Sequence, residues 1–178
     1  MYPGGSNRSL NHVGSRMPRV RIRLATSSDS RALANLRYRF RSETESATEN
    51  KARFVRRCIS WMKKHFHTSS SQWCCWVIDD GERLLGHVCV QLFEKVPNPI
   101  HDEPERHAYV TNFYVIPEMR RQGFGEKLLN KAVSWCRARG TDAIILWATA
   151  GSKSLYRRCG FVEPTDVFEL RAGFVRRR

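Results

Sequence analysis

The sequence predicts a single mixed α/β domain, and three observations support that class. Short stretches with the alternation of β-strands are interleaved with longer stretches of helical periodicity. One continuous apolar run, Ala143 to Ala148, is suited to a buried parallel strand. The chain has 178 residues, 41% of them hydrophobic, and no internal repeat, so it suits one domain with a sizeable core.

The first predicted elements are a strand and two helices. Arg19 to Ala25 alternates basic and apolar residues and predicts the strand. Thr26 and Asp29 form a T-x-x-D capping box, which predicts a helix that runs to about Glu43. A second helix is expected from about Thr48 to His65, because its apolar residues recur on one face.

A hairpin and a further strand are expected next. Gln72 to Ile78 and Arg83 to Phe93 are strand-like, and a short acidic turn that contains a glycine separates them, so together they predict a β-hairpin. A loop rich in proline and charge follows from Glu94 to Arg106. His107 to Val115 is the next predicted strand.

The C-terminal part alternates between helices and strands. A helix is expected from about Phe124 to Arg139, with Gly140 as a natural C-terminal cap. The apolar run described above follows as a strand. A short helix over about Ser152 to Cys159 comes next, and Phe168 to Arg171 is a candidate edge strand.

Composition limits the location and the partners. Met1 to Arg16 is rich in Gly, Ser, Asn and Arg and lacks periodicity, so we expect a disordered tail before a domain that spans residues 17–178. No apolar run approaches the roughly 20 residues of a membrane span, and no secretory signal is recognisable, so we expect a cytoplasmic protein without membrane association. The net charge of +14 attracts polyanions, but the positive residues are spread along the chain. A solvated basic surface is therefore favoured over a nucleic-acid interface.

The six cysteines do not indicate a metal site. None of them has C-x-x-C spacing. Cys74 and Cys75 are neighbours in a predicted strand, so their side chains should point to opposite faces, which is poor geometry for sharing a metal ion. We predict reduced thiols and no metal, and zinc found by elemental analysis of the purified protein would contradict this.

The turn before the third long helix has the composition of an anion site. A helix start presents unpaired backbone N–H groups and a partial positive charge. Gly123 and Gly125 lack Cβ atoms, which lets phosphate oxygens approach these amides closely. Arg120 and Arg121 add charge and forked donors. The segment therefore suits a pyrophosphate, although spacing alone is equally compatible with an ordinary glycine turn.

Two familiar phosphate-binding motifs are excluded. A Walker loop has Lys directly after its last glycine, whereas Glu126 follows Gly125 here. The dinucleotide pattern G-x-G-x-x-G has a third glycine where this chain has Leu128.

Three segments together resemble the GNAT acetyltransferase superfamily. The segment "VIPEMRRQGFGEKLL" is similar to its acyl-coenzyme-A-binding motif R/Q-x-x-G-x-G/A, with Arg120, Gly123 and Gly125 at the motif positions. "SLYRRCGF" resembles its second signature, a Tyr in a short helix that ends in Gly-Phe, and "RLATSSDSRALANLRYRF" resembles its first strand and helix. The resemblance covers about Arg19 to Leu170.

The resemblance implies a fold and a cofactor. The fold is a single mixed, mostly antiparallel sheet, flanked by helices, whose fourth and fifth strands splay apart to admit the pantetheine arm of acetyl-CoA or coenzyme A. The implied cofactor-binding residues are Phe113, Tyr114, Val115, Arg120, Arg121, Gln122, Gly123, Phe124, Gly125, Thr149 and Ser154. Backbone groups of the first three would hold the pantetheine, and the amides from Arg121 to Gly125 the pyrophosphate. Thr149 stands where many relatives have Asn, a substitution that weakens this contact.

The resemblance also implies N-acetyl transfer to a primary amine by direct attack within a ternary complex. Tyr156 matches the tyrosine that protonates the departing thiolate. The general base is left open between His107, Glu43, Glu105 and a chain of water molecules. His107 has a suitable ordinary pKa, and by alternation it shares a strand face with Tyr109 and Thr111, which are poor bases.

The acceptor amine is not determined by the sequence. A small amine, an amino acid or a protein N-terminus are all compatible with it. In the family the first two helices and the loop before the fourth strand shape the acceptor pocket, which directs attention to Arg41, Glu43, Trp61, Trp73, Asp102, Glu103 and Glu105. Family members are often dimers, so a homodimer is one expectation.

Two alternatives compete with this function. One is a basic RNA- or ribosome-associating protein that keeps a CoA-binding fold for regulation, although no nucleic-acid motif is recognisable and nucleic acid is not an expected partner. The other is a cofactor-binding domain that has lost catalysis, against which the presence of Tyr156 argues.

Overall fold

The structure of the protein is a computed structural model. It describes residues 20–44, 46–66, 72–97, 99–100, 102 and 104–170. The segment 1–16, for which a tail is expected, lies outside these residues. Within the described part, one sheet has the strand order β1-β2-β3-β4-β5. Its first four strands pair antiparallel, and β5 pairs parallel to β4, which confirms the predicted mixed, mostly antiparallel sheet.

The elements follow the predicted order with small changes at their ends. The strands are β1 (Arg21–Leu24), β2 (Trp73–Asp79), β3 (Leu84–Glu94), β4 (Arg106–Val115) and β5 (Ala143–Ile145). The helices are α1 (Ser30–Glu43), α2 (Lys51–Phe66), α3 (Phe124–Arg137) and α4 (Lys153–Arg158). The predicted hairpin is confirmed as β2 and β3, and one 3-10 turn, Ser27–Asp29, precedes α1.

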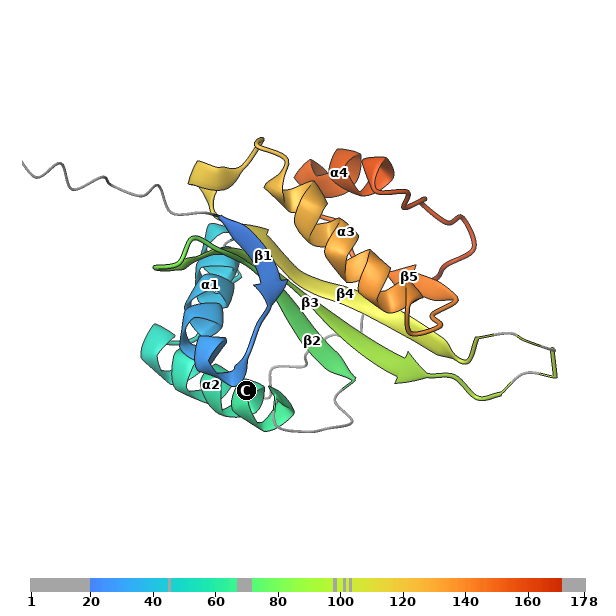
Figure 1. Ribbon diagram of the computed structural model, residues 1–178, viewed down its shortest axis with the longest axis horizontal. Coiled ribbons are helices and arrows are strands. Elements are labelled where there is room, and N and C mark those ends of the chain that lie inside the picture. Colours follow the sequence, from blue (N-terminus) through green and yellow to red (C-terminus); the bar gives the residue numbers. More distant parts are fainter. Residues whose placement is uncertain are drawn as a thin grey trace, which may run out of the picture.

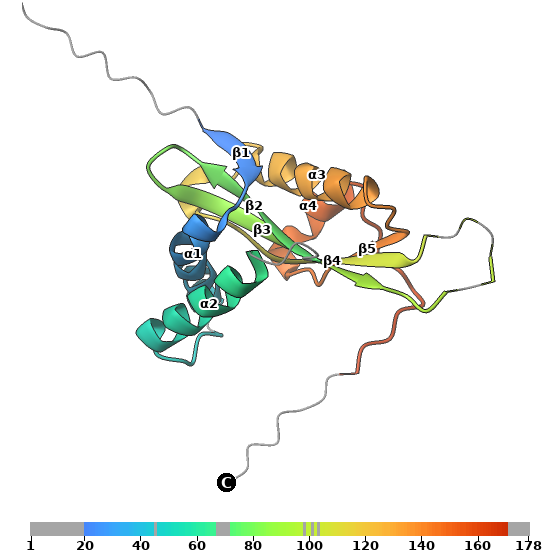
Figure 2. The same ribbon diagram turned by 60° about the horizontal axis from the view of Figure 1, so that its bottom comes forward.

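Helices cover both faces of the sheet (Figures 1 and 2). α1 and α2 pack on one face, where α1 meets β3 and β4, and α3 packs on the other against β2, β3 and β4. The apolar faces of the helices are buried between these layers, as Leu33 and Leu36 of α1 and Leu128 and Leu129 of α3 show. Because apolar residues at helical spacing must be buried on one side, the sequence pattern places these helices flat on the sheet.

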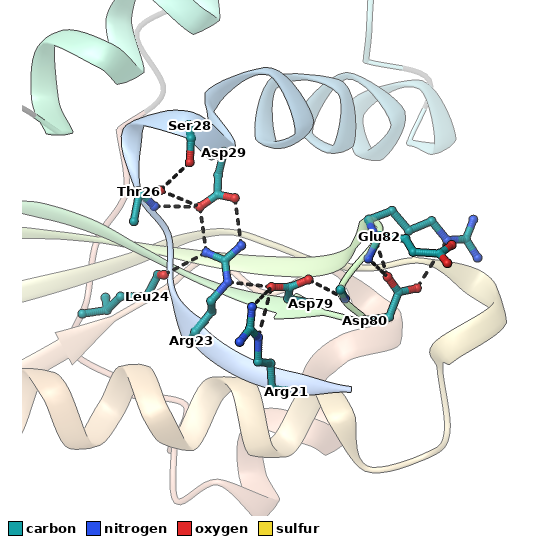
Figure 3. Close-up of polar contacts among 11 residues, drawn as sticks. Arg21, Arg23, Leu24, Thr26, Ser28, Asp29, Asp79, Asp80 and Glu82 are labelled. Atoms are coloured by element: carbon teal, nitrogen blue, oxygen red, sulfur yellow. Dashed lines mark hydrogen bonds and ion pairs between the residues drawn. The ribbon is translucent and has the colours of Figure 1, made fainter. Parts of the chain in front are cut away.

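A partly buried ion-pair network ties β1 to β2 and to the start of α1 (Figure 3). Arg23 donates to Asp79 at 2.7 Å and to Asp29 at 2.8 Å, and Arg21 reaches Asp79 at 3.0 Å. The Asp29 carboxylate also accepts from the backbone N–H of Thr26 at 2.7 Å, which confirms the capping-box interaction of this acid. The network fixes the edge strand β1 relative to β2 and to the turn that leads into α1.

Two strand predictions are corrected. The run Ala143 to Ala148 was predicted as a fully buried strand, but β5 ends at Ile145, and Ile145 and Trp147 are 40% and 59% exposed. β5 is an edge strand with one neighbour, so apolar side chains there are not enclosed on both sides. The predicted edge strand Phe168 to Arg171 is also absent from the described residues. Phe168 and Leu170 are almost fully exposed with no sheet edge beside them, and Arg171 lies outside the described residues.

A β-bulge in β4 changes which face its side chains take. The register with β3 shifts between His87 and Cys89, and Asn112 on β4 adopts a left-handed backbone with a φ of 50°. One extra residue in a strand reverses the alternation that follows it. The ring of Tyr114 therefore lies against α1, whereas Phe113 faces α4.

Candidate active site

The edge of β4 opens where β5 leaves it. β5 pairs only with His107, Ala108 and Tyr109. Beyond that point, the β4 segment 110–115 has no strand partner on this side within the described part of the chain. A strand edge with free N–H and C=O groups can bind an extended ligand as an additional strand. The predicted divergence of the fourth and fifth strands is therefore confirmed.

The turn that leads into α3 presents a row of free amides. Arg121 and Gly123 both have left-handed backbone, with φ values of 60° and 78°. In the described chain, no acceptor faces the backbone N–H groups of Arg121, Gln122 and Gly123. The next two N–H groups, of Phe124 and Gly125, belong to the first turn of α3 and so have no partner within the helix. Successive amides of this kind form an anion site at the positive end of a helix.

The two glycines of this turn have different surroundings. A Cβ added at Gly123 would meet no atom within 4 Å, so the requirement there is the left-handed backbone. A Cβ at Gly125 would lie 3.5 Å from side-chain carbons of both Leu155 and Phe113. Gly125 thus lets α3 approach α4 and β4 closely, whereas Gly123 shapes the loop.

The arginines beside the turn are also not equivalent. Arg120 turns back, donating to the Val115 carbonyl at 2.8 Å and to Glu43 at 2.7 Å. Arg121 is exposed at the surface of the turn. Arg158 of α4 lies beside the first turn of α3, where its Nε is 3.5 Å from a carboxylate oxygen of Glu126. The sequence analysis did not single out Arg158, because its position depends on how α4 packs against α3.

Tyr156 lies beside the open part of β4. The residue is only 9% exposed, and the centroid of its ring lies 6.1 Å from that of Phe113 on β4 and 5.9 Å from that of Phe161. Burial raises the pKa of the Tyr156 phenol, although a hydrogen bond with Ser152 acts in the opposite direction. The phenol is therefore protonated at neutral pH and can act as a proton donor.

Glu43 joins the end of α1 to both sides of this region. It accepts a short hydrogen bond from the Tyr114 hydroxyl and pairs with Arg120. Burial raises the pKa of Glu43, but the hydrogen bonds from Tyr114 and Arg120 outweigh it and hold the pKa below its usual value. Burial and the adjacent carboxylate raise the pKa of Tyr114 to about 12. Glu43 is accordingly ionised and already bonded through both oxygens.

His107 lies at the far end of β4. It pairs with Ala143 of β5, and its Nε2 lies 3.2 Å from the Asp142 carboxylate. Six residues of extended chain separate it from Phe113, a distance of about 20 Å along the strand. The structure does not bring His107 together with Tyr156 and the glycine turn. Glu105 is exposed and lies in the loop just before β4.

Three other predicted cofactor residues lie near the turn and α4. Gln122 donates to the Glu118 carbonyl at 2.9 Å. The Thr149 hydroxyl lies 3.0 Å from the Ser152 hydroxyl, in the 3-10 turn before α4. Ser154 is exposed in the first turn of α4.

The residues suggested for the acceptor pocket are dispersed. Trp61 of α2 and Trp73 of β2 pack edge to face with centroids 5.3 Å apart. Arg41 lies over the ring of Phe40. Asp102 is exposed in the loop before β4. Glu103 is not among the described residues.

The fold and site define a class of protein: a mixed-sheet α/β domain with an open strand edge and a turn of free backbone amides next to it. Residues 33–161 match the model of the Acetyltransferase (GNAT) family. The chain belongs to this family.

Individual relatives agree with this assignment. A 63-residue segment is 33% identical to an uncharacterised N-acetyltransferase of Methanocaldococcus jannaschii, covering 34% of this chain and 28% of that protein. Among solved structures, a GCN5-related N-acetyltransferase from Ralstonia eutropha has a TM-score of 0.71 at 24% identity, covering 87% of this chain and 100% of that one. A predicted acetyltransferase from Clostridium acetobutylicum, solved with acetyl-CoA, has a TM-score of 0.71 at 18% identity, covering 86% of this chain and 96% of that one.

Other kinds of site find no support in the described residues. None of their helices is both long and apolar enough to cross a membrane. Nor do three or more of their His, Cys, Asp and Glu side chains gather where a metal ion could be held. The comparisons give no support to the RNA-associating alternative.

Proposed function

We propose that the protein transfers the acetyl group of acetyl-CoA to a primary amine by direct attack in a ternary complex. The observation that carries this proposal is the adjacency of two features: the unpaired edge of β4 and the free amides from Arg121 to Gly125. An extended pantetheine arm can pair with the unpaired strand edge, and a diphosphate can bind the free amides. Membership of the acetyltransferase family supports the same conclusion.

Different groups of the chain bind different parts of the cofactor. Amides from Arg121 to Gly125 hold the diphosphate, with Arg121 and Arg158 adding positive charge. Backbone groups at Phe113 hold the pantetheine along the open edge, whereas the predicted contribution of Tyr114 is corrected, because its backbone carbonyl faces β3. The Val115 carbonyl is already bonded to Arg120, so the contribution near Val115 is an amide N–H that polarises the thioester carbonyl. Thr149 and Ser154 border the same region.

In the reaction, the amine nitrogen forms a bond to the thioester carbon while the carbon–sulfur bond breaks. Tyr156 gives its proton to the departing thiolate, a role that its protonated state and its position beside β4 support. The proton lost by the amine passes to solvent through water molecules, and the Tyr156 phenolate regains a proton from solvent before the next turnover. Neither His107, at the far end of β4, nor Glu43, with both oxygens bonded, is well placed to take it.

We further propose Glu43 as a positioning residue. By holding Tyr114 and Arg120, it fixes the end of β4 relative to the turn before α3. The thioester must lie between these two segments, and a small displacement there would lower the rate.

Calorimetric titration with coenzyme A tests the cofactor site with a matched pair of variants. Gly123 and Gly140 lie at opposite ends of α3, have φ values of 78° and 65°, and face open space. Replacing either by Ala strains the backbone by roughly 1 kcal/mol. Gly123→Ala should weaken coenzyme A binding at least about tenfold, because it disturbs the amides that hold the diphosphate. Gly140→Ala should bind like the unmodified protein.

Two results would overturn the proposal. One is no binding of coenzyme A or acetyl-CoA by the unmodified chain. The other is binding without release of free thiol from acetyl-CoA in the presence of any amine in a panel of amino acids, polyamines and peptides. If Gly123→Ala and Gly140→Ala weakened binding equally, the diphosphate would not lie at this turn.

A further inference from the structure

Two polar side chains on the α1 side of the sheet, Arg37 and His87, have buried nitrogens without partners and are close enough to interact electrostatically. His87 of β3 is fully buried, and neither of its ring nitrogens has a hydrogen-bond partner in the described chain. Arg37 of α1 points its Nη1 atom into the protein, where this atom is also buried without a partner. The charge of Arg37 acts on His87, and together with burial it lowers the pKa of His87 to about 3, so this histidine is a neutral donor.

This pair lies on the face of the sheet that borders the proposed site. His87 pairs with Tyr114 across β3 and β4, and Cys89, two residues further on the same face, pairs with Thr111. Arg37 is close enough to Cys89 and Tyr109 to interact electrostatically with both. The group is therefore bounded by the middle of β4, on the opposite face from Phe113. Tyr109 and Thr111, on the same face of β4, are half-buried.

No carboxylate of the described chain neutralises Arg37. The acids near either end of α1 are engaged elsewhere, Asp29 with Arg23 and Glu43 with Arg120 and Tyr114. Burial lowers the pKa of the Arg37 guanidinium, which expresses the free-energy penalty of this environment for a cation. Leaving a partly buried guanidinium and a buried imidazole without partners is unfavourable, and an anion with two acceptor atoms would accept hydrogen bonds from the guanidinium and from the single N–H of the neutral imidazole.

We propose that Arg37 and His87 bind the carboxylate of the acceptor, so that the substrate class is an amine that also carries a carboxylate, as an amino acid does. This inference rests on the proposed acetyl transfer. One guanidinium and one neutral imidazole supply a single positive charge, which matches a carboxylate; a phosphate dianion would leave a negative charge buried. With its carboxylate held there, the acceptor extends its amine towards the open edge of β4.

The test compares acids with their amides on the full chain. Initial rates of thiol release are measured at saturating acetyl-CoA with glycine against glycinamide, β-alanine against β-alaninamide, and phenylalanine against phenylalaninamide. The variant is Arg37→Gln, and the matched control is Arg31→Gln, an exposed arginine of the same helix. Comparing the acid-to-amide ratio of kcat/KM between proteins cancels the different basicities of the amines.

The acid-to-amide ratio of the unmodified protein should fall at least about tenfold in Arg37→Gln and stay within about twofold in Arg31→Gln. Coenzyme A affinity should be the same in all three proteins. Arg37→Lys keeps the positive charge but loses the paired N–H donors of the guanidinium, so it should retain part of the preference for acids over amides. This variant serves as the readout if Arg37→Gln does not fold. An acid-to-amide ratio that is unchanged in both Arg37→Gln and Arg37→Lys overturns the proposal and indicates that only water solvates Arg37 and His87.

A second readout separates this inference from the proposed function. Thermal unfolding is followed with N-acetylglycine and with N-acetylglycinamide, which need no turnover. Greater stabilisation by the acid, lost in Arg37→Gln, supports the carboxylate site even if no amine is acetylated. Equal effects of the acid and the amide contradict it even if coenzyme A binds and acetyl transfer occurs.

Discussion

Arg120 donates to Glu43 at 2.7 Å, joining the C-terminal end of α1 to the turn before α3. The same arginine donates to the Val115 carbonyl at the end of β4. Three elements far apart in the sequence thus meet through one guanidinium. Arg120, the arginine of the glycine motif, therefore connects α1, β4 and the turn before α3 in this structure. The free amides belong to the backbone that follows it, from Arg121 to Gly125.

Glu43→Gln tests whether this acid positions the site or acts as the base. A positioning role predicts a fall in kcat/KM of less than about tenfold with an unchanged pH–rate profile, whereas loss of a general base costs about 10²-fold or more. We expect the smaller effect. A loss above 10²-fold, accompanied by disappearance of an acidic limb from the profile, would restore Glu43 as the base.

The same variant should change stability with pH in a defined direction. The folded state lowers the pKa of Glu43, so its stabilisation is present above the ordinary value of 4.5 and is lost as the pH falls below it. We expect Glu43→Gln to lower the free energy of unfolding by about 1 kcal/mol at pH 7, since the pair is partly exposed. Urea unfolding at pH 7 and pH 3 should show this difference shrinking at the lower pH.

Tyr156→Phe should separate chemistry from binding. The phenol is the proposed acid, while the ring packs against Phe113 and Phe161. Phenylalanine keeps that packing, so we expect kcat to fall about 10²-fold with coenzyme A affinity within twofold. Single-turnover thiol release and calorimetry measure the two quantities. Equal turnover by Tyr156→Phe and the unmodified protein would remove Tyr156 from the mechanism.

His107→Gln should leave turnover nearly unchanged. The histidine pairs with Asp142 at the closed end of β4, about 20 Å along the strand from Phe113. We expect kcat/KM within threefold of the unmodified protein between pH 6 and pH 9. A larger fall that is greatest near neutral pH and fades at high pH, where the amine is already neutral, would show that the amine is deprotonated at this end of the strand.

Asp79→Asn should remove an acid-dependent part of the stability. Hydrogen bonds from Arg23, the Gly81 amide and Arg21 hold the pKa of Asp79 at about 2 despite its burial. Its ionised form therefore stabilises the fold by about 2 kcal/mol above the ordinary pKa of 3.8, and this contribution disappears as the pH falls through about 2.

Urea unfolding at pH 7 should show Asp79→Asn destabilised by at least that amount, and the difference should narrow between pH 4 and pH 2. Asp166→Asn, at an exposed position near the C-terminus, should match the unmodified protein throughout. Parallel behaviour of the two variants would mean that the network at β1 does not stabilise the fold.

The sequence was most informative where one local pattern corresponds to one structure. Apolar residues at helical spacing predicted α1, α2 and α3, and alternation predicted the hairpin of β2 and β3. Gly123 and the helix after it predicted a turn with free amides, because a helix start leaves them unpaired whatever the rest of the fold. Local pattern was less reliable at the sheet edge, where an apolar run produced only the short, partly exposed β5.

By itself, then, the sequence determined the order of the helices and strands from β1 to α4, the buried faces of the long helices and the turn with free amides before α3, since these depend on residues close together in the chain. Only the tertiary structure decided that Arg120 bonds to Glu43, that His107 lies far from Tyr156, and that the unpartnered nitrogens of Arg37 and His87 are buried near one another. Such relations depend on register, on the bulge at Asn112 and on helix packing. A shift of one residue in any of these turns a side chain to another face, so short-range patterns cannot specify them.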